Sequence, residues 1–446
     1  MSGELVLVRK GAYYDSVTLM RVSRALTELP GVAAAMVAMA TELNVAVIRD
    51  LGFTVPEAGP SDLLIALRAA DPDAAVAEAD RRLTGFQPQE TAAEQPPLTT
   101  FSAARTPADL VLVSVPGEHA FAEALDAIQA GLPVMIFSDG VSVARERRLK
   151  ELAEEKDVLV MGPDCGTAVI GGVGLGFANV LTPGPVGVVA ASGTGAQQVT
   201  CLLDWAGTGV SHVLGVGGRD LSAEVGGLST LRALRLLDED PATELIVLVS
   251  KPPSPEVARM VREAEERLRT PVVRALLNEG TDLTAATEEA LRVLGRPVPE
   301  WPSWPAWSGR TAPHKTIKGV YSGGTLSAEA AQIAGQGDFV DYGDDAYTDG
   351  RAHPMIDPTL RVEALARARD TDVVLMDVVL GHGADPDPAA SLAHAVARTP
   401  ATVVVALIGT EGDPQDLHRQ AAAFREAGAA VFTSNAQAAR HARSLL

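Results

Sequence analysis

The chain is dominated by one local pattern, in which a short valine-rich run leads into a glycine-rich turn and then into helical spacing of apolar residues. Residues 185–190 form such a run, the turn Ser192-Gly193-Thr194-Gly195 follows, and helical spacing starts at Ala196. A run of this length suits a strand buried in a parallel sheet. The turn leaves backbone N–H groups unpaired at the start of the helix, and such donors can bind an anion. A tight turn without a ligand explains one such loop equally well.

A second loop supports the anion-site interpretation. The apolar run 213–216 ends in Gly217-Gly218-Arg219-Asp220. Loops at the carboxyl ends of neighbouring parallel strands face the same crevice. We therefore predict that Gly217, Gly218 and Asp220 bind substrate together with the turn 192–195.

The same pattern restarts near the carboxyl end. Residues 316–321 are predicted to form a strand, Ser322-Gly323-Gly324-Thr325 a turn and 326–334 a helix, which indicates a duplicated design. The amino end of a helix carries roughly half a positive charge, so such turns can hold an anion without many lysines. That matters in a chain with 37 Lys plus Arg against 57 Asp plus Glu and a net charge of −20. This charge argues against a nucleic acid or an anionic membrane as the partner.

The most polar part of the chain is the loop at residues 341–358. It contains Asp344, Asp345, Arg351 and His353, a density of charge that suits acid–base work, metal ligation or an arginine clamp on a carboxylate. A capped surface loop explains Asp357, which precedes a predicted helix. It explains Arg351 and His353 poorly, so we take these two, with Arg219, as candidate catalytic residues. Asp344 and Asp345 are candidate substrate-binding residues.

Two other strand ends carry candidate binding residues. Lys251 follows the strand 245–249 and could hold a phosphate or carboxylate as a point charge. Gly381 and His382 follow the strand 373–379. A solvated lysine and an ordinary loop histidine are the simpler alternatives. No metal site is predicted.

Several of these motifs resemble the α subunit of succinyl-CoA synthetase. They are Met161-Gly162-Pro163-Asp164-Cys165-Gly166, the Gly-Pro-Val-Gly strand, the first serine-glycine turn and the Gly-Val-Gly-Gly-Arg-Asp turn. The whole chain resembles the FdrA family, a synthetase-related family found with ureide (allantoin) degradation, most specifically in the string DYGDDAYTDGRAHPMIDP. The resemblance covers most of residues 103–446. It implies that two helix N-termini, one from each half of the chain, point at one phosphate.

The FdrA resemblance also implies an activity. These proteins are linked to oxamate carbamoyltransferase, in which oxalurate and phosphate give oxamate and carbamoyl phosphate. It predicts that Arg219, Lys251 or Arg351 clamps the oxamate carboxylate, that His353 shuttles a proton, and that phosphate or carbamoyl phosphate is a substrate. No cofactor is assigned with certainty, and CoA or a nucleotide is left open. The expected partners are a small anionic substrate, the other subunits of a carbamoyltransferase complex and a second copy of the chain.

Two rival functions stay open. One is an acyl-CoA ligase of the synthetase type. The absence of a histidine between residues 252 and 295, where the synthetase carries phosphate, opposes it, as does the absence of a glycine-rich CoA fingerprint before the strand at residues 110–115. The other is a non-catalytic scaffold that binds metabolites and positions a catalytic partner.

The predicted fold is a multi-domain α/β protein whose cores are built from Ala, Val and Leu, because only 4% of the residues are aromatic. Its parts are a small N-terminal α/β domain (1–86, with a ferredoxin-like arrangement as one option), a linker (87–102), a half-Rossmann, CoA-binding-like domain (103–182), a flavodoxin-like domain of the synthetase α type (183–296), a tryptophan- and proline-rich linker (297–315) and a flavodoxin-like domain of the β type (316–446).

The cellular setting follows from what the sequence lacks. Cys165 and Cys201 are the two cysteines, too few for a disulfide framework. The sequence has no apolar stretch of membrane-spanning length, and its first residues have no signal-peptide pattern. We therefore expect a cytoplasmic protein.

Overall fold

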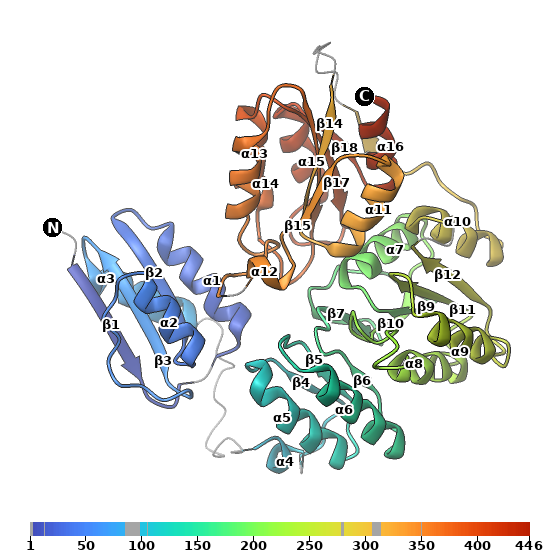
Figure 1. Ribbon diagram of the computed structural model, residues 1–446, viewed down its shortest axis with the longest axis horizontal. Helices are drawn as coiled ribbons and strands as arrows, with labels where there is room; N and C mark the ends of the chain where they lie inside the picture. Colours follow the sequence, from blue (N-terminus) through green and yellow to red (C-terminus); the bar gives the residue numbers. More distant parts are fainter. Residues whose placement is uncertain are drawn as a thin grey trace. The chain divides into compact units, whose positions relative to one another are not determined.

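The computed structural model describes residues 3–12, 14–84, 99–104, 106–277, 281–305, 314–348 and 350–446 (Figure 1). These residues form two compact units. One comprises 1–103 with the short segments 114–116 and 348–352, and the other comprises the rest of the chain. Most of the linker 87–102 and half of the linker 297–315 lie outside the described residues. No helix within the described ranges is long and apolar enough to cross a membrane.

The N-terminal unit is built on a three-stranded antiparallel sheet. Its central strand β3 pairs with β1 on one side and β2 on the other, which is the split βαβ arrangement. A ferredoxin-like sheet has a fourth strand, and the described part of residues 3–84 contains none, so the ferredoxin-like option holds for three strands only. The elements are β1 (Gly3–Arg9), α1 (Ser16–Thr27), β2 (Val32–Met39), α2 (Glu42–Asp50), β3 (Leu63–Ala69), α3 (Pro72–Thr84) and the short α4 (Thr100–Ala103).

The second unit begins with a small parallel sheet in the order β4-β5-β6. Its helices alternate with its strands, as expected for half of a Rossmann domain. The elements are β4 (Val111–Val113), α5 (Gly117–Gln129), β5 (Val134–Ile136), α6 (Val143–Glu155) and β6 (Val160–Met161).

The second sheet of this unit has the order β12-β11-β9-β10-β7-β8. Three of its four parallel strands match the predicted runs 185–190, 213–216 and 245–249, and an antiparallel hairpin, β7–β8, extends it beside β10. We did not predict this hairpin, which turns at Gly171 and Gly172 and reaches across the boundary drawn at residue 183. The elements are β7 (Thr167–Ile170), β8 (Val173–Gly176), β9 (Pro183–Ala190), α7 (Gly193–Trp205), β10 (Val210–Gly215), α8 (Leu228–Glu239), β11 (Leu245–Ser250), α9 (Pro255–Glu265), β12 (Val272–Leu276) and α10 (Leu283–Val293).

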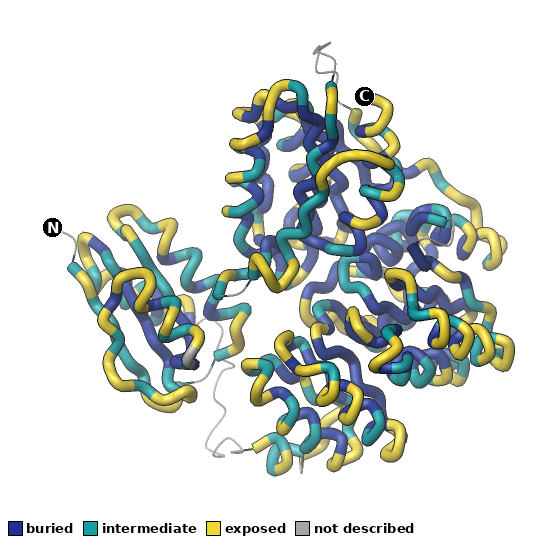
Figure 2. The backbone as a smooth tube through the Cα atoms, viewed as in Figure 1, coloured by how far each residue is buried: buried dark blue, intermediate teal, exposed yellow. Residues whose placement is uncertain are grey.

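The third sheet has the order β13-β18-β17-β16-β14-β15, and all its strands are parallel except β13. Every residue of the central strand β16 is buried, and the inner strands of this sheet are dark in Figure 2. The elements are β13 (Ser303–Trp304), β14 (Thr316–Tyr321), α11 (Gly324–Ala334), β15 (Asp338–Asp341), α12 (Asp345–Thr348), α13 (Thr359–Arg367), β16 (Asp372–Val379), α14 (Pro388–Arg398), β17 (Thr402–Ile408), α15 (Leu417–Glu426), β18 (Ala430–Phe432) and α16 (Asn435–Ser444).

Buried polar groups join the second and third sheets in a fixed arrangement. Gln198 on α7 accepts the Asn435 N–H at 2.8 Å and donates to the Thr433 carbonyl at 3.0 Å. Glu329 on α11 accepts the Leu283 N–H and the Asn435 side-chain amide. Burial raises the pKa of Glu329 to about 7. Because these buried groups are hydrogen-bonded across the junction, they oppose displacement of the second sheet relative to the third.

A buried charge network joins the small parallel sheet to the second sheet. Lys150 on α6 donates to Glu146 at 2.8 Å, to Asp220 at 2.7 Å and to the Val216 carbonyl at 2.9 Å, and all three charged side chains are at most 2% exposed. Arg219 donates to the other oxygen of Glu146 at 3.0 Å. Two cations thus balance two carboxylates at the end of β10.

Replacing Lys150 with Met should destabilise the protein by about 3–5 kcal/mol, because Asp220 would remain buried without its cation and Glu146 would keep Arg219 alone. The shift of the urea unfolding transition measures this. Lys156 is an exposed lysine at the C-cap of the same helix. Lys156→Met is therefore the matched control and should change stability by no more than about 0.5 kcal/mol. Equal effects of the two substitutions would contradict a structural role for the network.

Candidate functional site

The two serine-glycine turns lie against each other. A Cβ atom added at Gly323 would lie 2.6 Å from the Thr194 Cβ, and one added at Gly195 would lie 3.1 Å from the Thr325 Cγ2. A side chain at Gly323 would force Thr194 to shift, so this glycine allows the close approach. Figure 1 shows α7 and α11 side by side at this point. The meeting of the turns that the family resemblance implied is therefore present in the structure.

The two turns differ by one residue in how they begin their helices. Ser192 is the N-cap of α7, and its Oγ accepts the Gly195 N–H at 3.0 Å. Gly323, not Ser322, is the N-cap of α11, and it has no side chain to accept a bond. The first N–H groups of α11 consequently have no acceptor within the helix. Of the two helix ends, α11 therefore offers more free donors to a ligand.

Lys251 and Asp341 bring opposite charges to the start of α11. The Lys251 Nζ lies 3.0 Å, and the Asp341 Oδ2 2.6 Å, from the position of a Cβ on Gly324. The other oxygen of Asp341 accepts the Gly343 N–H at 2.9 Å. Burial raises the pKa of Asp341, and the hydrogen bond from Gly343 and the charge of Lys251 lower it in part. Asp341 belongs to the polar loop but was not singled out from the sequence.

His353 lies on the far side of the same loop. Its Nδ1 accepts the Met355 N–H at 3.3 Å, and its ring packs on Phe177 with the centroids 5.5 Å apart. Its Nε2 lies 2.7 Å from the position of a Cβ on Gly343, a position that also lies 2.6 Å from the Ser322 carbonyl oxygen. Burial, with a smaller effect of nearby Arg361, lowers the pKa of His353 to about 4. His353 is therefore a neutral imidazole near the α11 turn.

The buried ion pair of Asp377 and Arg361 holds the α11 turn through hydrogen bonds. The Oδ1 of Asp377 accepts both the N–H and the hydroxyl of Ser322, at 2.8 and 2.9 Å. Arg361 donates to the Asp377 carbonyl at 2.6 Å, to the same Oδ1 at 3.1 Å and to the Pro354 carbonyl at 3.3 Å. Burial raises the pKa of Asp377 to about 6 in spite of Arg361. The pair therefore connects the turn to the loop that carries His353.

The structure corrects the roles of several predicted binding residues. Asp220 is fully buried, and its two oxygens accept from Lys150, the Ser229 N–H, and the N–H and hydroxyl of Thr230, so it is structural. The N–H and carbonyl of Gly381 are both bonded to the Gln415 side chain, so Gly381 is structural as well. These polar groups already have partners and have little to offer a substrate.

The sequence analysis also placed His382, Gly217 and Arg351 in the site. The backbone of His382 pairs with Ala178, and its side chain is exposed. Gly217 packs against the backbone at Gly162 and Pro163. Arg351 is exposed in the segment 348–352, which packs with the N-terminal unit.

Arg219, Gly218 and Asp345 lie around Asp164 instead. The Asp164 Oδ2 lies 4.0 Å from a Cβ placed on Gly218. Desolvation raises the pKa of Asp164 to about 7, the charges of Asp139 and Asp345 add to this rise, and Arg219 opposes it. Asp344 is exposed and caps the turn at Ala346. No cluster of three or more metal-ligating side chains occurs in the described part of the chain.

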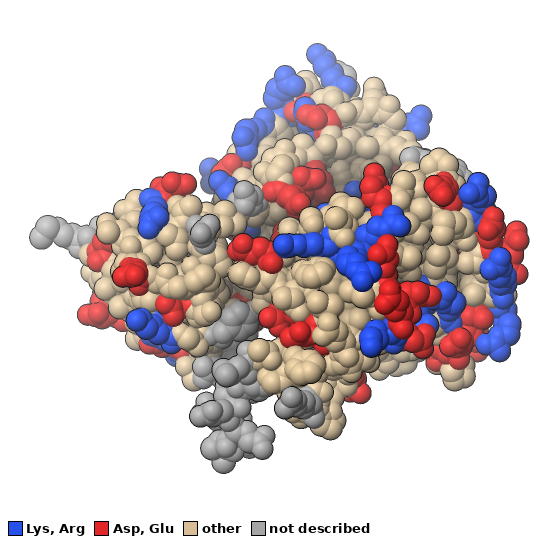
Figure 3. Space-filling model, turned by 60° about the horizontal axis from the view of Figure 1, so that its bottom comes forward, with Lys and Arg blue, Asp and Glu red and all other residues tan. Residues whose placement is uncertain are grey.

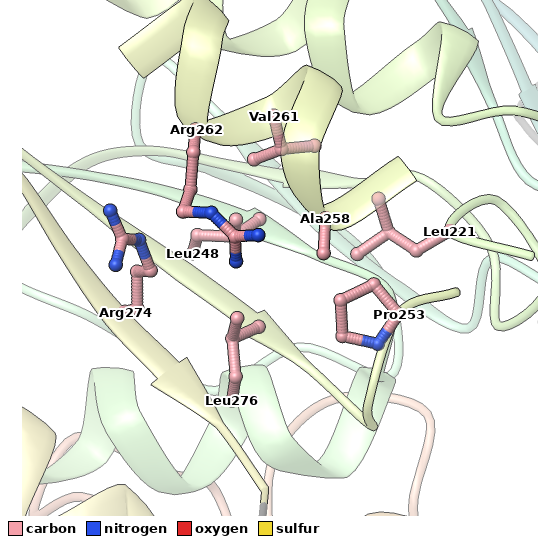
Figure 4. Close-up of a pocket in the computed structure, with 8 residues that line it drawn as sticks. All are labelled: Leu221, Leu248, Pro253, Ala258, Val261, Arg262, Arg274 and Leu276. Carbon is pink, nitrogen blue, oxygen red and sulfur yellow. The ribbon is translucent and has the colours of Figure 1, made fainter. Parts of the chain in front are cut away.

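The enclosed cavity in Figure 4 does not coincide with this site. Its volume is about 10 Å³, space for about one water molecule, and its lining is mostly apolar, with Leu248, Val261 and Leu276 beside Arg262 and Arg274. A wider hollow of about 440 Å³ lies between α8 and α9. On the face shown in Figure 3, Lys and Arg lie among Asp and Glu, so no extended basic surface appears there.

Known proteins resemble separate parts of the chain. A family model described as AllF, heavy metal-associated domain, matches residues 1–100, and a CoA-ligase model matches residues 320–445. The first hundred residues contain neither cysteine nor histidine, so thiolate and imidazole ligands for a metal are missing there. The malate–CoA ligase α subunit of Methylorubrum extorquens is 28% identical over 33% of this chain and 52% of its own length. The succinate–CoA ligase α subunit 1 of Archaeoglobus fulgidus is 30% identical over 34% and 52%.

Among solved structures, a dinucleotide-forming acetyl-coenzyme A synthetase 1 of Candidatus Korarchaeum cryptofilum covers 80% of this chain at 15% identity and a TM-score of 0.34. A match that spans the whole chain is the uncharacterized protein YahF of Escherichia coli, which is 35% identical over 99% of this chain and 98% of its own. The chain is a multi-domain α/β protein with a CoA-ligase domain, and it belongs to the same succinyl-CoA synthetase-related family as YahF.

Proposed function

We propose that this chain transfers an acyl-type group between a carbonyl donor and phosphate, with the phosphate held where α7 and α11 meet. One observation carries the proposal: Thr194 lies on Gly323 at the start of α11, and Lys251 reaches the same turn. Two helix N-termini, each with roughly half a positive charge, and one ammonium group suit an anion of this size. Thr194 and Gly324 are partly exposed, so the turns are accessible to solvent.

Within this class we propose a carbamoyl group, as the FdrA resemblance implies. Hydrogen phosphate attacks the ureido carbonyl carbon of oxalurate, a carbon–oxygen bond forms, and the carbon–nitrogen bond to the oxamate nitrogen breaks. The proton of hydrogen phosphate passes to that nitrogen, giving oxamate and carbamoyl phosphate. Both reactants are anions, so the helix ends and Lys251 would lower the cost of bringing them together.

The oxamate carboxylate needs its own cation. Arg219 remains the candidate, because its side chain keeps 44% exposure while it bonds Glu146. Arg351 is the alternative, since it is exposed and one guanidinium can hold a carboxylate through two bonds. We also propose that the chain works as a homo-oligomer with further subunits of a carbamoyltransferase complex in the cytoplasm.

An acyl-CoA ligase is the second candidate, and the similarity to CoA-ligase subunits favours it. Two features of this chain oppose it. Residues 252–295 contain no histidine to carry phosphate, and residues 99–110, which precede β4, contain no glycine for a phosphate-binding loop.

One assay discriminates the two candidates. The purified chain, alone and with the proteins encoded beside it, is incubated with oxalurate and phosphate, and carbamoyl phosphate is trapped as citrulline by ornithine carbamoyltransferase. Citrulline formation supports carbamoyl transfer. ADP release that requires CoA and a carboxylic acid, without citrulline, would support the ligase, and neither product from the complete complex would leave the scaffold function.

Lys251→Met should weaken the binding of inorganic phosphate roughly tenfold or more, because a charge-assisted hydrogen bond is lost. Isothermal titration calorimetry measures the affinity. Lys156→Met is the control for a lost surface charge and should leave the affinity unchanged. If the two variants bind phosphate equally well, Lys251 does not touch it.

Gly323→Ala should destabilise the second unit by about 1–3 kcal/mol, since the new methyl group collides with Thr194. Thr194→Gly in the same chain should recover most of this loss relative to Thr194→Gly alone. Urea unfolding of the four proteins of this cycle measures the coupling. Gly59→Ala, where the nearest atom is 3.7 Å away, is the matched control. Simple additivity of the two changes would mean that the turns are not in contact in solution.

A further inference from the structure

We propose that His353 serves this site as a neutral hydrogen-bond donor through its Nε2–H, and that it neither carries phosphate nor shuttles a proton. The inference rests on the proposed function for the identity of the group that receives the hydrogen bond. The protonation of the ring itself follows from the contacts of this chain and can be measured without substrate.

The contacts of Nδ1 fix which nitrogen of the ring bears the proton. The Met355 N–H points at Nδ1 at 3.3 Å, and a backbone N–H can only donate. Nδ1 must therefore present its lone pair, and the proton of the neutral ring lies on Nε2. The turn is held firmly, because the His353 carbonyl accepts the N–H groups of Ile356 and Asp357 at 2.7 and 3.0 Å.

The surroundings of the ring keep it uncharged. Phe177 covers one side, and the guanidinium of Arg361 lies close enough to repel a second positive charge. Burial is the larger effect, and together they lower the pKa to about 4, so the ring is neutral near pH 7. The carboxylates of Asp341 and Asp377 also face this region, and Arg361 is paired with Asp377.

A neutral ring with its proton on Nε2 has a restricted chemistry. To attack phosphorus, Nε2 needs a free lone pair, and that requires the proton to move to Nδ1, where it would oppose the Met355 N–H. Phosphate transfer through His353 is therefore disfavoured. Donation from Nε2–H needs no rearrangement, and neutral imidazole is a known donor to carbonyl oxygens in enzymes.

The position of Nε2 places this donor at the α11 turn. Nε2, the Ser322 carbonyl oxygen and the Asp341 Oδ1 all lie within 3.2 Å of a Cβ position on Gly343. Arg361 and Asp377 act as positioning residues, since they tie Pro354, which follows His353, to Ser322. When phosphate attacks a carbonyl carbon, charge develops on the carbonyl oxygen, and a fixed donor stabilises it. Removing one such donor costs about 10²–10³ in kcat.

The activity test uses three replacements of His353. His353→Gln keeps an N–H donor at the distance of Nε2 and should retain activity within about tenfold, whereas His353→Asn offers its amide near the Nδ1 position. His353→Asn and His353→Ala should both lose about 100-fold or more in kcat. In the wild type, no ionisation attributable to His353 should appear in the kcat–pH profile between pH 5.5 and 8. His394→Gln, at an exposed histidine on α14, is the control and should behave as the wild type.

A second measurement needs no activity. Long-range ¹H–¹⁵N NMR of histidine-labelled protein, with the His353 signals assigned by their loss in His353→Gln, should show a neutral ring with a pyrrole-type Nε2 and a pyridine-type Nδ1 at pH 7. A proton on Nδ1, a charged ring, or a phosphohistidine signal in ³¹P NMR after incubation with carbamoyl phosphate or ATP would overturn the inference. The expected ring state without citrulline formation would overturn the proposed function alone.

Discussion

The direct contact between the amino ends of α7 and α11 is the constraint on which the candidate site depends. Two positive helix ends repel each other, and their approach is stabilised when negative charge lies near them. The chain supplies part of that charge through Asp341, whose Oδ2 lies at the first residue of α11. Gly323 makes the approach sterically feasible, and the bonds of Gln198 and Glu329 across the junction hold the two half-sheets in place. An anionic substrate at this point would complete a charge balance that the fold leaves unfinished.

Buried ion pairs fix the loops around this contact. Asp377 and Arg361 lie under the α11 turn, and the Lys150 network lies at the end of β10. Such pairs add little net stability compared with apolar side chains of the same size, but removing one partner is costly. Within the described residues, the Oδ2 of Asp377 and the Nε of Arg361 have no hydrogen-bond partner. The pair therefore leaves part of its hydrogen-bonding capacity unused. Its contribution is to fix the geometry of the turn.

The sequence predicted the parallel strands and their order along the chain, because valine-rich runs followed by glycine are local signals. The meeting of the two turns was implied by the family resemblance alone. It failed where bonding partners lie far apart. Asp220 ends a glycine-rich turn and was therefore predicted to bind substrate. Its carboxylate instead accepts a hydrogen bond from Lys150, which lies seventy residues earlier in the chain. Gly381 was predicted to bind substrate because it follows a strand. In the structure, the Gln415 side chain bonds both the N–H and the carbonyl of Gly381. The hairpin β7–β8 was missed because its strands are only four residues long and half of β8 is glycine. Asp377 did leave a signal, since a carboxylate inside a run of buried valines rarely lacks a specific partner.

The second and third sheets belong to one chain, and this has a consequence for the assembly of their junction on dilution. The malate–CoA and succinate–CoA ligase relatives are α subunits by name, whereas here both turns belong to one polypeptide. The encounter of the two helix ends is therefore an intramolecular event with a high effective concentration. The junction forms once per chain and in fixed stoichiometry, so its formation is independent of protein concentration.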